Sequence, residues 1–427
     1  MDDRLRYYKN AFLIDGSGQS VIKAPSAMIV EGNRIKAVGL QSSFACPEGA
    51  ETVDLSGMTL MPGMTDCHDH LADLEGGMQV RAGIPPSLAV FLAADSFKQT
   101  LFGGFTAIRD ASGVDLGMKM AVERGLIPGP RLKISVVILS QFGGHNDHTE
   151  AAGINSHFPW LQSIPSGICD GVDECRKKTR EVIRAGADWV KIATTGGVGT
   201  PIGGPLIRQF SPEEVRVIVD TAHAAGKPVM SHAYGGEGVK ICLDAGVDSI
   251  EHGAVLDDAL IEQMVKQGTW LVPTFTVLRL ILAISEKNPQ ALPSYMAPKA
   301  QNLLEHQAES FRKSLKAGVK IALGTDGGGF GHGQNAKELH YLVEAGMTPM
   351  QALVAATSMG AACMGIGDET GILRKDMLAD FLVVDGNPLE DVRILENRER
   401  LKMIVKDGQI IKDELHTVNN TEDQSKN

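Results

Sequence analysis

Short apolar segments rich in β-branched residues alternate with helical patterns from residue 64 to about residue 360, and this alternation constrains the fold most strongly. Ala-Gly pairs precede several of the segments, as at Ala185-Gly186 and Ala317-Gly318. Glycine just past a helix commonly forms a left-handed cap, so these pairs predict helix ends. Eight strands with intervening helices favour an α/β fold of the (β/α)8 TIM-barrel type over an open doubly wound sheet. The predicted strands span residues 64–67, 105–109, 132–139, 189–193, 228–231, 249–250, 270–273 and 319–324.

The two ends of the chain have a different pattern. Residues 7–60 contain short apolar runs separated by Gly, Asn and Asp, which predicts a small antiparallel β unit. Similar runs return at residues 379–385, 401–405 and 409–411. We therefore expect both ends to build one small β-sandwich beside the barrel. The expected division is β-sandwich at residues 1–62 and 365–415, barrel at residues 63–364, and a polar tail at residues 416–427.

Composition argues against several classes of partner. The chain of 427 residues has a formal net charge of −11 and no Lys/Arg-rich block, which argues against nucleic acid and anionic membranes. Its six cysteines include no C-x-x-C pair, as expected for reduced thiols. The first residues form no apolar signal segment, and no run of about 18 apolar residues occurs. We expect a cytoplasmic enzyme, with a secretion signal already removed as the alternative.

Two histidines one residue apart, His68 and His70, follow the apolar run of residues 58–64. Side chains alternate along a strand, so both imidazoles would point to the same side and could bind one metal ion. Such a pair alone is weak evidence, because most are solvated or hydrogen-bonded histidines. Barrel active sites form at the C-terminal ends of the strands. Four more metal-competent or titratable residues stand at predicted strand ends, namely Lys191, His232, His252 and Asp326.

Each of these four residues also has an ordinary structural interpretation. Lys191 alone would suggest a salt-bridged lysine, although it lies inside an apolar segment, WVKI. His232 and His252 alone would suggest core or capping histidines, and Asp326, followed by three glycines, could cap a turn. Six such residues in this order, at the ends of five predicted strands, favour one shared site over six unrelated roles.

The pattern of these six residues resembles the amidohydrolase superfamily. The segments GMTDCHDH at residues 63–70, Ala379-Asp380 and DGNP at residues 385–388 match it as well. The resemblance covers the chain except its tail, and it is strongest to the imidazolonepropionase-like and prolidase-like branch, which contains dipeptidases. One departure is Asp376, which stands where relatives usually have glycine. The turn at this position therefore need not have the geometry that the family pattern implies.

The resemblance implies two divalent metal ions, with zinc as the expected metal. His68, His70 and Asp326 would hold one ion, and His232 and His252 the other. Lys191 would bridge both as a carbamate formed with carbon dioxide, a reaction that needs a neutral amine and that burial favours. Members that work with one metal lack this lysine. Relatives commonly form symmetric assemblies, so we also expect a homo-oligomer.

The same resemblance implies a hydrolytic mechanism. A hydroxide activated by the metals would attack an amide carbon, while Asp326 would take a proton and pass it to the leaving amine. His145, in a loop after the third predicted strand, would bind the substrate and stabilise the oxyanion. Tyr234 shares a strand face with His232 and would bind a substrate carboxylate or carbonyl, although ordinary packing explains it equally well. Arg109 and its neighbour Asp110 suggest a buried structural pair.

The substrate is less determined than the chemistry. The first hypothesis is an amide bond in a small dipeptide or N-acyl amino acid, such as Xaa-Pro, Xaa-Arg/Lys or an N-acylated toxin. The alternative is a cyclic amide, as in imidazolonepropionase, or a carbamate; Lys191 counts against imidazolonepropionase itself. A non-catalytic assembly protein on the same fold would lack ligands, and none of the six is missing. The loop at residues 143–171, with His148 and His157, could form a lid.

Overall fold

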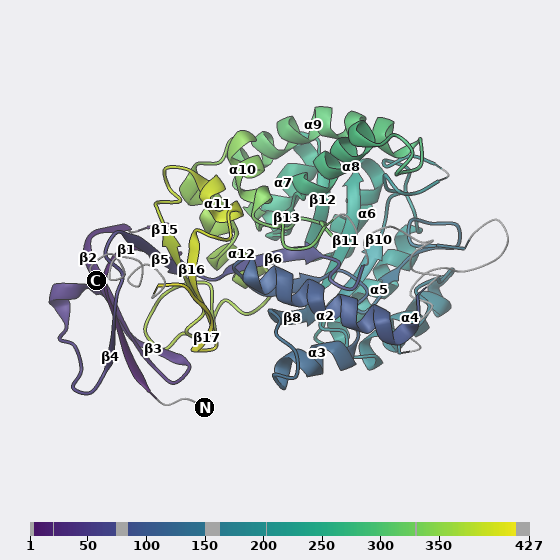
Figure 1. Cartoon of the computed structure of the whole chain (residues 1–427). Helices are drawn as coiled ribbons and strands as arrows, with labels where there is room; N and C mark the ends of the chain where they lie inside the picture. The colour runs from purple at the N-terminus through teal and green to yellow at the C-terminus, as the bar shows by residue number, and fades with distance from the viewer. Residues whose placement is uncertain are drawn as a thin grey trace.

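The computed structural model describes residues 4–19, 21–73, 84–149, 163–201, 203–328 and 331–415. The strands of the two chain ends, purple and yellow in Figure 1, gather at one side of the molecule, and a mixed α/β part forms the other. In the described ranges, no helix is both long and apolar enough to cross a membrane.

The α/β part contains parallel strands in two hydrogen-bonded sheets. Backbone hydrogen bonds also link the sheets, from Cys67 N–H to the Leu323 carbonyl at 2.8 Å and from Asp188 N–H to the Ile134 carbonyl at 2.7 Å. The strand pairings among the described residues do not form one continuous ladder, so barrel closure stays a prediction. One sheet holds β6 (Met64–Asp69), β7 (Phe105–Asp110) and β8 (Arg131–Ile134); the other holds β9 (Ile138–Leu139), β10 (Val190–Ala193), β11 (Val229–Gly235), β12 (Ser249–Val255), β13 (Trp270–Val272) and β14 (Lys320–Ile321).

The third predicted strand, at residues 132–139, is wrong as a single strand. Val136, between β8 and β9, has a φ of 68°, which β-branched residues rarely adopt. The Val137 N–H donates to the Ser135 carbonyl at 2.7 Å, so the chain turns sharply there. The break lies where the chain passes from one sheet to the other: β8 pairs with β7, whereas β9 pairs with β10.

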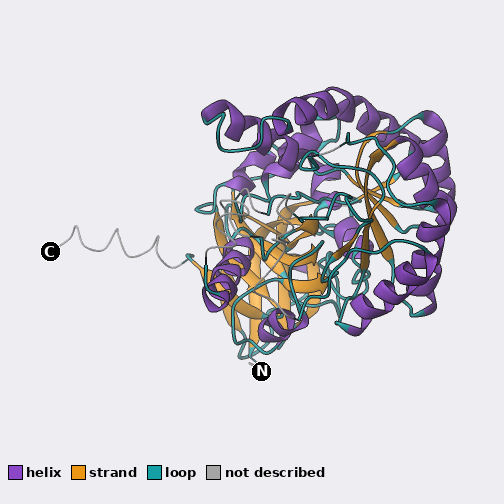
Figure 2. Cartoon of the chain, turned by 90° about the vertical axis from the view of Figure 1, so that its right-hand side faces the viewer, coloured by secondary structure: helices purple, strands orange, loops and turns teal. Residues whose placement is uncertain are grey.

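Helices lie along the outside of the parallel strands (Figure 2). The glycines that follow Ala185, Ala225, Ala245 and Ala317 have φ angles between 69° and 101°, which confirms the predicted helix stops. The helices are α2 (Pro86–Phe102), α3 (Leu116–Glu123), α4 (Val172–Arg184), α5 (Pro212–Ala224), α6 (Gly236–Ala245), α7 (Asp258–Gln267), α8 (Phe275–Lys287), α9 (Met296–Ala317), α10 (Lys337–Glu344), α11 (Pro349–Ala355) and α12 (Ser358–Cys363).

Both chain ends contribute strands to a single hydrogen-bonded sheet of eight strands, and the β-sandwich expected from the sequence stays a prediction. Its centre is the antiparallel pairing of β5 with β15, where Leu60 lies opposite Val383. The sheet is not purely antiparallel, because β4 and β5 run parallel to β1. The order is β17 (Gln409–Asp413), β16 (Leu401–Lys406), β15 (Phe381–Asp385), β5 (Met58–Pro62), β1 (Leu5–Ile14), β2 (Val21–Glu31) and β3 (Arg34–Leu40), with β4 (Glu51–Asp54) beside β1.

Asp376 lies in a turn that contacts this sheet. Its φ is 71°, and its N–H donates to the Ile35 carbonyl at 2.8 Å. This left-handed conformation favours glycine, although aspartate tolerates it better than most residues. The departure from the family pattern therefore falls at a position with special backbone geometry.

Arg131, at the start of β8, joins the α/β part to the sheet of the chain ends. Its Nη2 atom lies 3.2 Å from Asp380 Oδ2 and 2.5 Å from Asp407 Oδ1. The Asp380 carboxylate is fully buried, and burial raises its pKa while Arg131 opposes that rise. One guanidinium therefore pairs with two carboxylates at the junction.

Replacing Arg131 by alanine should lower the free energy of unfolding by about 3 kcal/mol, because the buried Asp380 would lose its partner. Chemical denaturation of both proteins measures the difference. The matched control is Arg393→Ala, since Arg393 and its partner Asp391 are exposed and such pairs contribute little. Equal losses in the two variants would contradict this assignment.

Candidate functional site

The residues predicted to form the site stand at neighbouring strand ends. The chain after β14 is bonded to β6, because the Thr325 and Asp326 N–H groups both donate to the His68 carbonyl, at 3.1 and 2.7 Å. This contact brings the two ends of the strand series together. The candidate ligands are His68 on β6, His70 directly after it, Lys191 on β10, His232 on β11, His252 on β12 and Asp326 after β14.

His68, His70 and Asp326 form a compact cluster. Asp326 Oδ1 lies 3.5 Å from His68 Nε2 and 3.2 Å from His70 Nε2. The potential ligand atoms of the three residues all lie within 4.8 Å of one another, close enough for one metal ion to bind all three. Burial opposes both charges, yet Asp326 raises the pKa of His70 to about 9, and the histidines lower the pKa of Asp326.

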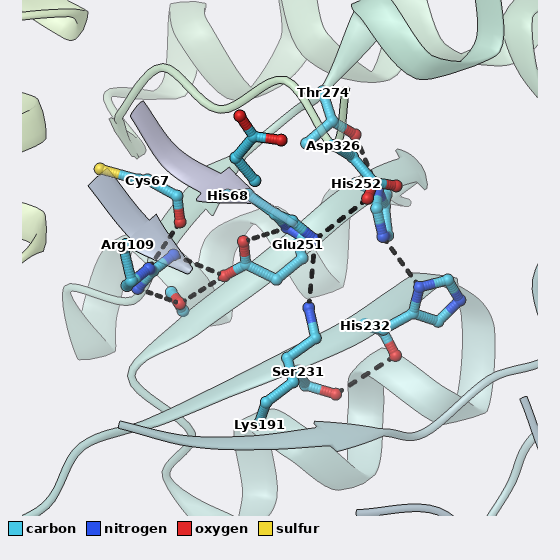
Figure 3. A network of polar contacts seen from close by, with 12 residues as sticks. Cys67, His68, Arg109, Lys191, Ser231, His232, Glu251, His252, Thr274 and Asp326 are labelled. Atoms are coloured by element: carbon cyan, nitrogen blue, oxygen red, sulfur yellow. Dashed lines mark hydrogen bonds and ion pairs between the residues drawn. The ribbon is translucent and has the colours of Figure 1, made fainter. Parts of the chain in front are cut away.

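Lys191, His232 and His252 lie beside this cluster (Figure 3). His252 Nε2 is 2.8 Å from His232 Nδ1, and Lys191 Nζ is 3.5 Å from His68 Nε2. The ring centroids of His68 and His252 are 5.1 Å apart. Lys191 is completely buried, and burial lowers its pKa to about 8. The structure therefore brings all six predicted ligands to one centre.

The four histidines share an arrangement that suits metal binding. In each ring, one nitrogen contacts an oxygen at the periphery, which leaves the other nitrogen for the centre. A carbonyl or carboxylate can only accept a hydrogen bond, so the contacting nitrogen of three rings carries the proton. Metal-binding histidines are typically oriented in this way. The contacts are His68 Nδ1 to Glu251 at 2.7 Å, His70 Nδ1 to the Ser112 carbonyl at 3.2 Å, His232 Nε2 to the Gly196 carbonyl at 3.1 Å, and His252 Nδ1 to Thr274 Oγ1 at 2.7 Å.

The Glu251 carboxylate is a supporting residue that the sequence analysis missed. It is fully buried, and it accepts hydrogen bonds from His68 and from Arg109 Nη2 at 2.9 Å. The predicted pair of Arg109 with Asp110 is wrong, because Asp110 accepts the N–H groups of Leu71 and Val114 instead. A charged residue inside an apolar strand, the same signal that marked Lys191, could have identified Glu251.

His145 and Tyr234 pack against the second pair of histidines. The His145 ring stacks on His232 with centroids 3.9 Å apart, and Tyr234 stacks on His252 at 4.8 Å. Burial and the nearby His148 lower the pKa of His145 to about 3, so its ring is neutral. Within the described ranges, the Tyr234 hydroxyl forms no hydrogen bond. His157 and part of the suggested lid lie outside the described residues.

Histidine and carboxylate side chains gathered at the ends of parallel strands are the arrangement that metal-dependent hydrolases use. The model of the amidohydrolase family matches residues 59–411. The chain belongs to the amidohydrolase family, and it is a hydrolase acting on carbon–nitrogen bonds, as the sequence predicts.

Several well-described proteins are similar to this chain over nearly its whole length. Ochratoxinase from Aspergillus niger is 32% identical over 421 residues, which cover 94% of this chain and 85% of that protein. A crystal structure of a Xaa-Pro dipeptidase with bound methionine is 31% identical, with a TM-score of 0.85 over 96% of this chain and 100% of that one. A prolidase complexed with N-methylphosphonate-L-proline is 30% identical, with a TM-score of 0.88 and the same coverage.

Gly328 should be essential for the position of His70. A Cβ atom at residue 328 would lie 2.4 Å from the His70 carbonyl oxygen and 2.6 Å from its Cβ. We expect Gly328→Ala to weaken metal binding roughly 10- to 100-fold, as changes to residues that orient ligands do. Gly327→Ala is the control, because its Cβ would meet nothing closer than 3.4 Å. Equal metal affinities of both variants, from titration of metal-free protein, would refute the expectation.

Proposed function

We propose that this protein is a binuclear metal-dependent amidohydrolase that cleaves the amide bond of a small dipeptide or N-acyl amino acid. The observation that carries the proposal is the convergence of six candidate ligands from five strand ends on one centre, where four of the six side chains are buried. The proposal includes a closed (β/α)8 barrel, which the family match and the similar structures support, and an additional β-sandwich with the boundaries expected from the sequence. A non-catalytic role is disfavoured, because no candidate ligand is replaced.

The donor set fits two divalent ions, with zinc expected for mixed nitrogen and oxygen ligands. His68, His70 and Asp326 would hold one ion, and His232 and His252 the other. Lys191 would stand between them as a carbamate; its complete burial and its pKa of about 8 support the neutral amine that carbamate formation needs. Bound ions would supply activated water and polarise the amide carbonyl.

The chain itself would contribute the proton transfers and the binding of substrate. Asp326 is held as a carboxylate between two histidines, which suits a group that accepts a proton and returns it to the leaving amine. His145 would donate a hydrogen bond to the oxyanion that develops on the substrate. The Tyr234 hydroxyl would bind a substrate carboxylate or carbonyl.

The relatives support amides of amino acids as the substrate class. The names Xaa-Pro dipeptidase and prolidase favour a dipeptide, and the name ochratoxinase favours an N-acylated toxin. A second candidate is a cyclic amide, because an imidazolonepropionase from Geobacillus is 22% identical over 425 residues. Lys191 disfavours this candidate, since the single-metal members of the superfamily lack that lysine.

Lys191→Ala should remove most of the activity and of the bound metal, because the bridging group would be lost. Short carboxylic acids should restore part of both. Metal analysis of protein purified with zinc and bicarbonate measures the change, with close to two ions per chain expected before mutation. Lys240→Ala is the control, since Lys240 is exposed and pairs with Asp244. Fewer than one ion per chain in the unmodified protein would rule out the binuclear site.

A substrate panel tests the reaction class. Zinc-loaded enzyme should hydrolyse some members of a set of Xaa-Pro and Xaa-Arg/Lys dipeptides and N-acyl amino acids. Release of free amino acid, followed by chromatography, measures turnover. Turnover of lactams or carbamates with no turnover of the linear amides would contradict the proposed substrate class, and turnover of lactams alone would favour the cyclic amide.

A further inference from the structure

His145 uses only one ring nitrogen in contacts with the described part of the protein. Its Nδ1 atom lies 2.9 Å from Thr200 Oγ1, and its ring stacks on His232. No described residue forms a hydrogen bond with Nε2. In a neutral imidazole one nitrogen donates and the other accepts. The direction of the Thr200 contact therefore decides whether Nε2 is a hydrogen-bond donor or an acceptor.

The direction of the Thr200 contact follows from the other partner of the hydroxyl. Thr200 Oγ1 already accepts the Gly197 N–H at 2.8 Å, and Thr200 is only 2% exposed. Among the residues that the structure describes, His145 Nδ1 is the one acceptor within reach of the hydroxyl proton. In the opposite arrangement Nδ1–H would donate to Oγ1 and leave a buried hydroxyl proton unpaired, which is costly. The hydroxyl therefore donates to Nδ1.

We propose that Thr200 is a positioning residue that holds neutral His145 as the Nε2–H tautomer, so that Nε2 can donate to the substrate oxyanion. The inference rests on the proposed function, in which His145 stabilises that oxyanion. In the described part of the chain, the Thr200 side chain forms hydrogen bonds with His145 and the Gly197 N–H and with none of the candidate metal ligands, so it would act through His145. Neither the family match nor the sequence pattern identifies this residue.

Several contacts hold the turn that carries Thr200 in place next to His145. The Thr200 N–H donates to the Gly197 carbonyl at 3.2 Å, and Lys299 on α9 donates to the Thr200 carbonyl at 2.6 Å. A side chain at Gly197 would collide with His145, since its Cβ would lie 2.2 Å from Cε1. The same turn orients a predicted metal ligand, because the Gly196 carbonyl accepts from His232 Nε2. One short segment thus sets the orientation of two imidazoles.

Nitrogen-15 NMR of histidine-labelled protein tests the tautomer directly. The His145 signals, assigned with a His145→Ala variant, should show a protonated Nε2 and an unprotonated Nδ1 in the unmodified protein. Lys299→Met, which removes one hydrogen bond of the turn but keeps the Thr200 hydroxyl and both bonds between Gly197 and Thr200, should leave this pattern unchanged. A protonated Nδ1 in the unmodified protein would overturn the proposal. This measurement needs no substrate, so it remains decisive even if no member of the substrate panel is hydrolysed.

Kinetics test the consequence for catalysis. Thr200→Val should lower kcat roughly 10-fold or more with little change in KM. Without the hydroxyl, His145 would no longer be held with its proton on Nε2, and that N–H acts on the transition state. Thr200→Ser, which keeps the hydroxyl, should restore most of the rate. In a His145→Ala background, Thr200→Val should have no further effect. Fully additive losses would mean that Thr200 acts through the turn alone, and an unchanged kcat in Thr200→Val would equally contradict the proposal.

Discussion

The structure around the site depends on one buried carboxylate, that of Glu251. An isolated carboxylate in the interior would be very costly, and here Arg109 at 2.9 Å and His68 at 2.7 Å both contact it. Arg109 and His68 belong to the three-stranded sheet, whereas Glu251 belongs to the six-stranded one. The contact therefore links the two sheets through the interior. The Arg109 guanidinium also lies over the ring of Trp189, directly before β10, with Cζ 4.3 Å from the ring centroid.

Three residues around the site have left-handed backbones although none is glycine. His252, Thr274 and Asp326 have φ angles of 74°, 50° and 52°, and such conformations cost of order 1–3 kcal/mol each. Surrounding contacts hold them in place. The Glu338 carboxylate, for example, accepts the first N–H groups of α8 at 2.8 and 2.7 Å, directly after Thr274. The left-handed backbone at His252 lies directly after Glu251, so two neighbours on β12 serve different roles: Glu251 contacts His68 from the periphery, and His252 faces the centre.

Features that depend on neighbouring residues follow from the sequence. Alternation along a strand predicts His68 and His70 on one side, and glycine caps predict the helix ends. Features that depend on contacts between distant residues do not follow from it. Arg109 reaches Glu251, 142 residues away in the chain, rather than its neighbour Asp110. The break at Val136 was invisible in a run of apolar residues, because it arises from the way two sheets divide their pairing.

The sequence by itself determined the types of the candidate ligands, their order and their places at strand ends, because these follow from periodicity and motif. It also determined that both chain ends form one β unit. Only the tertiary structure decided which nitrogen of each imidazole faces the centre. That choice depends on oxygen atoms such as those of Glu251 and Gly196, which lie 183 and 36 residues from the histidines they orient. No local pattern encodes such contacts, since folding alone brings their partners together.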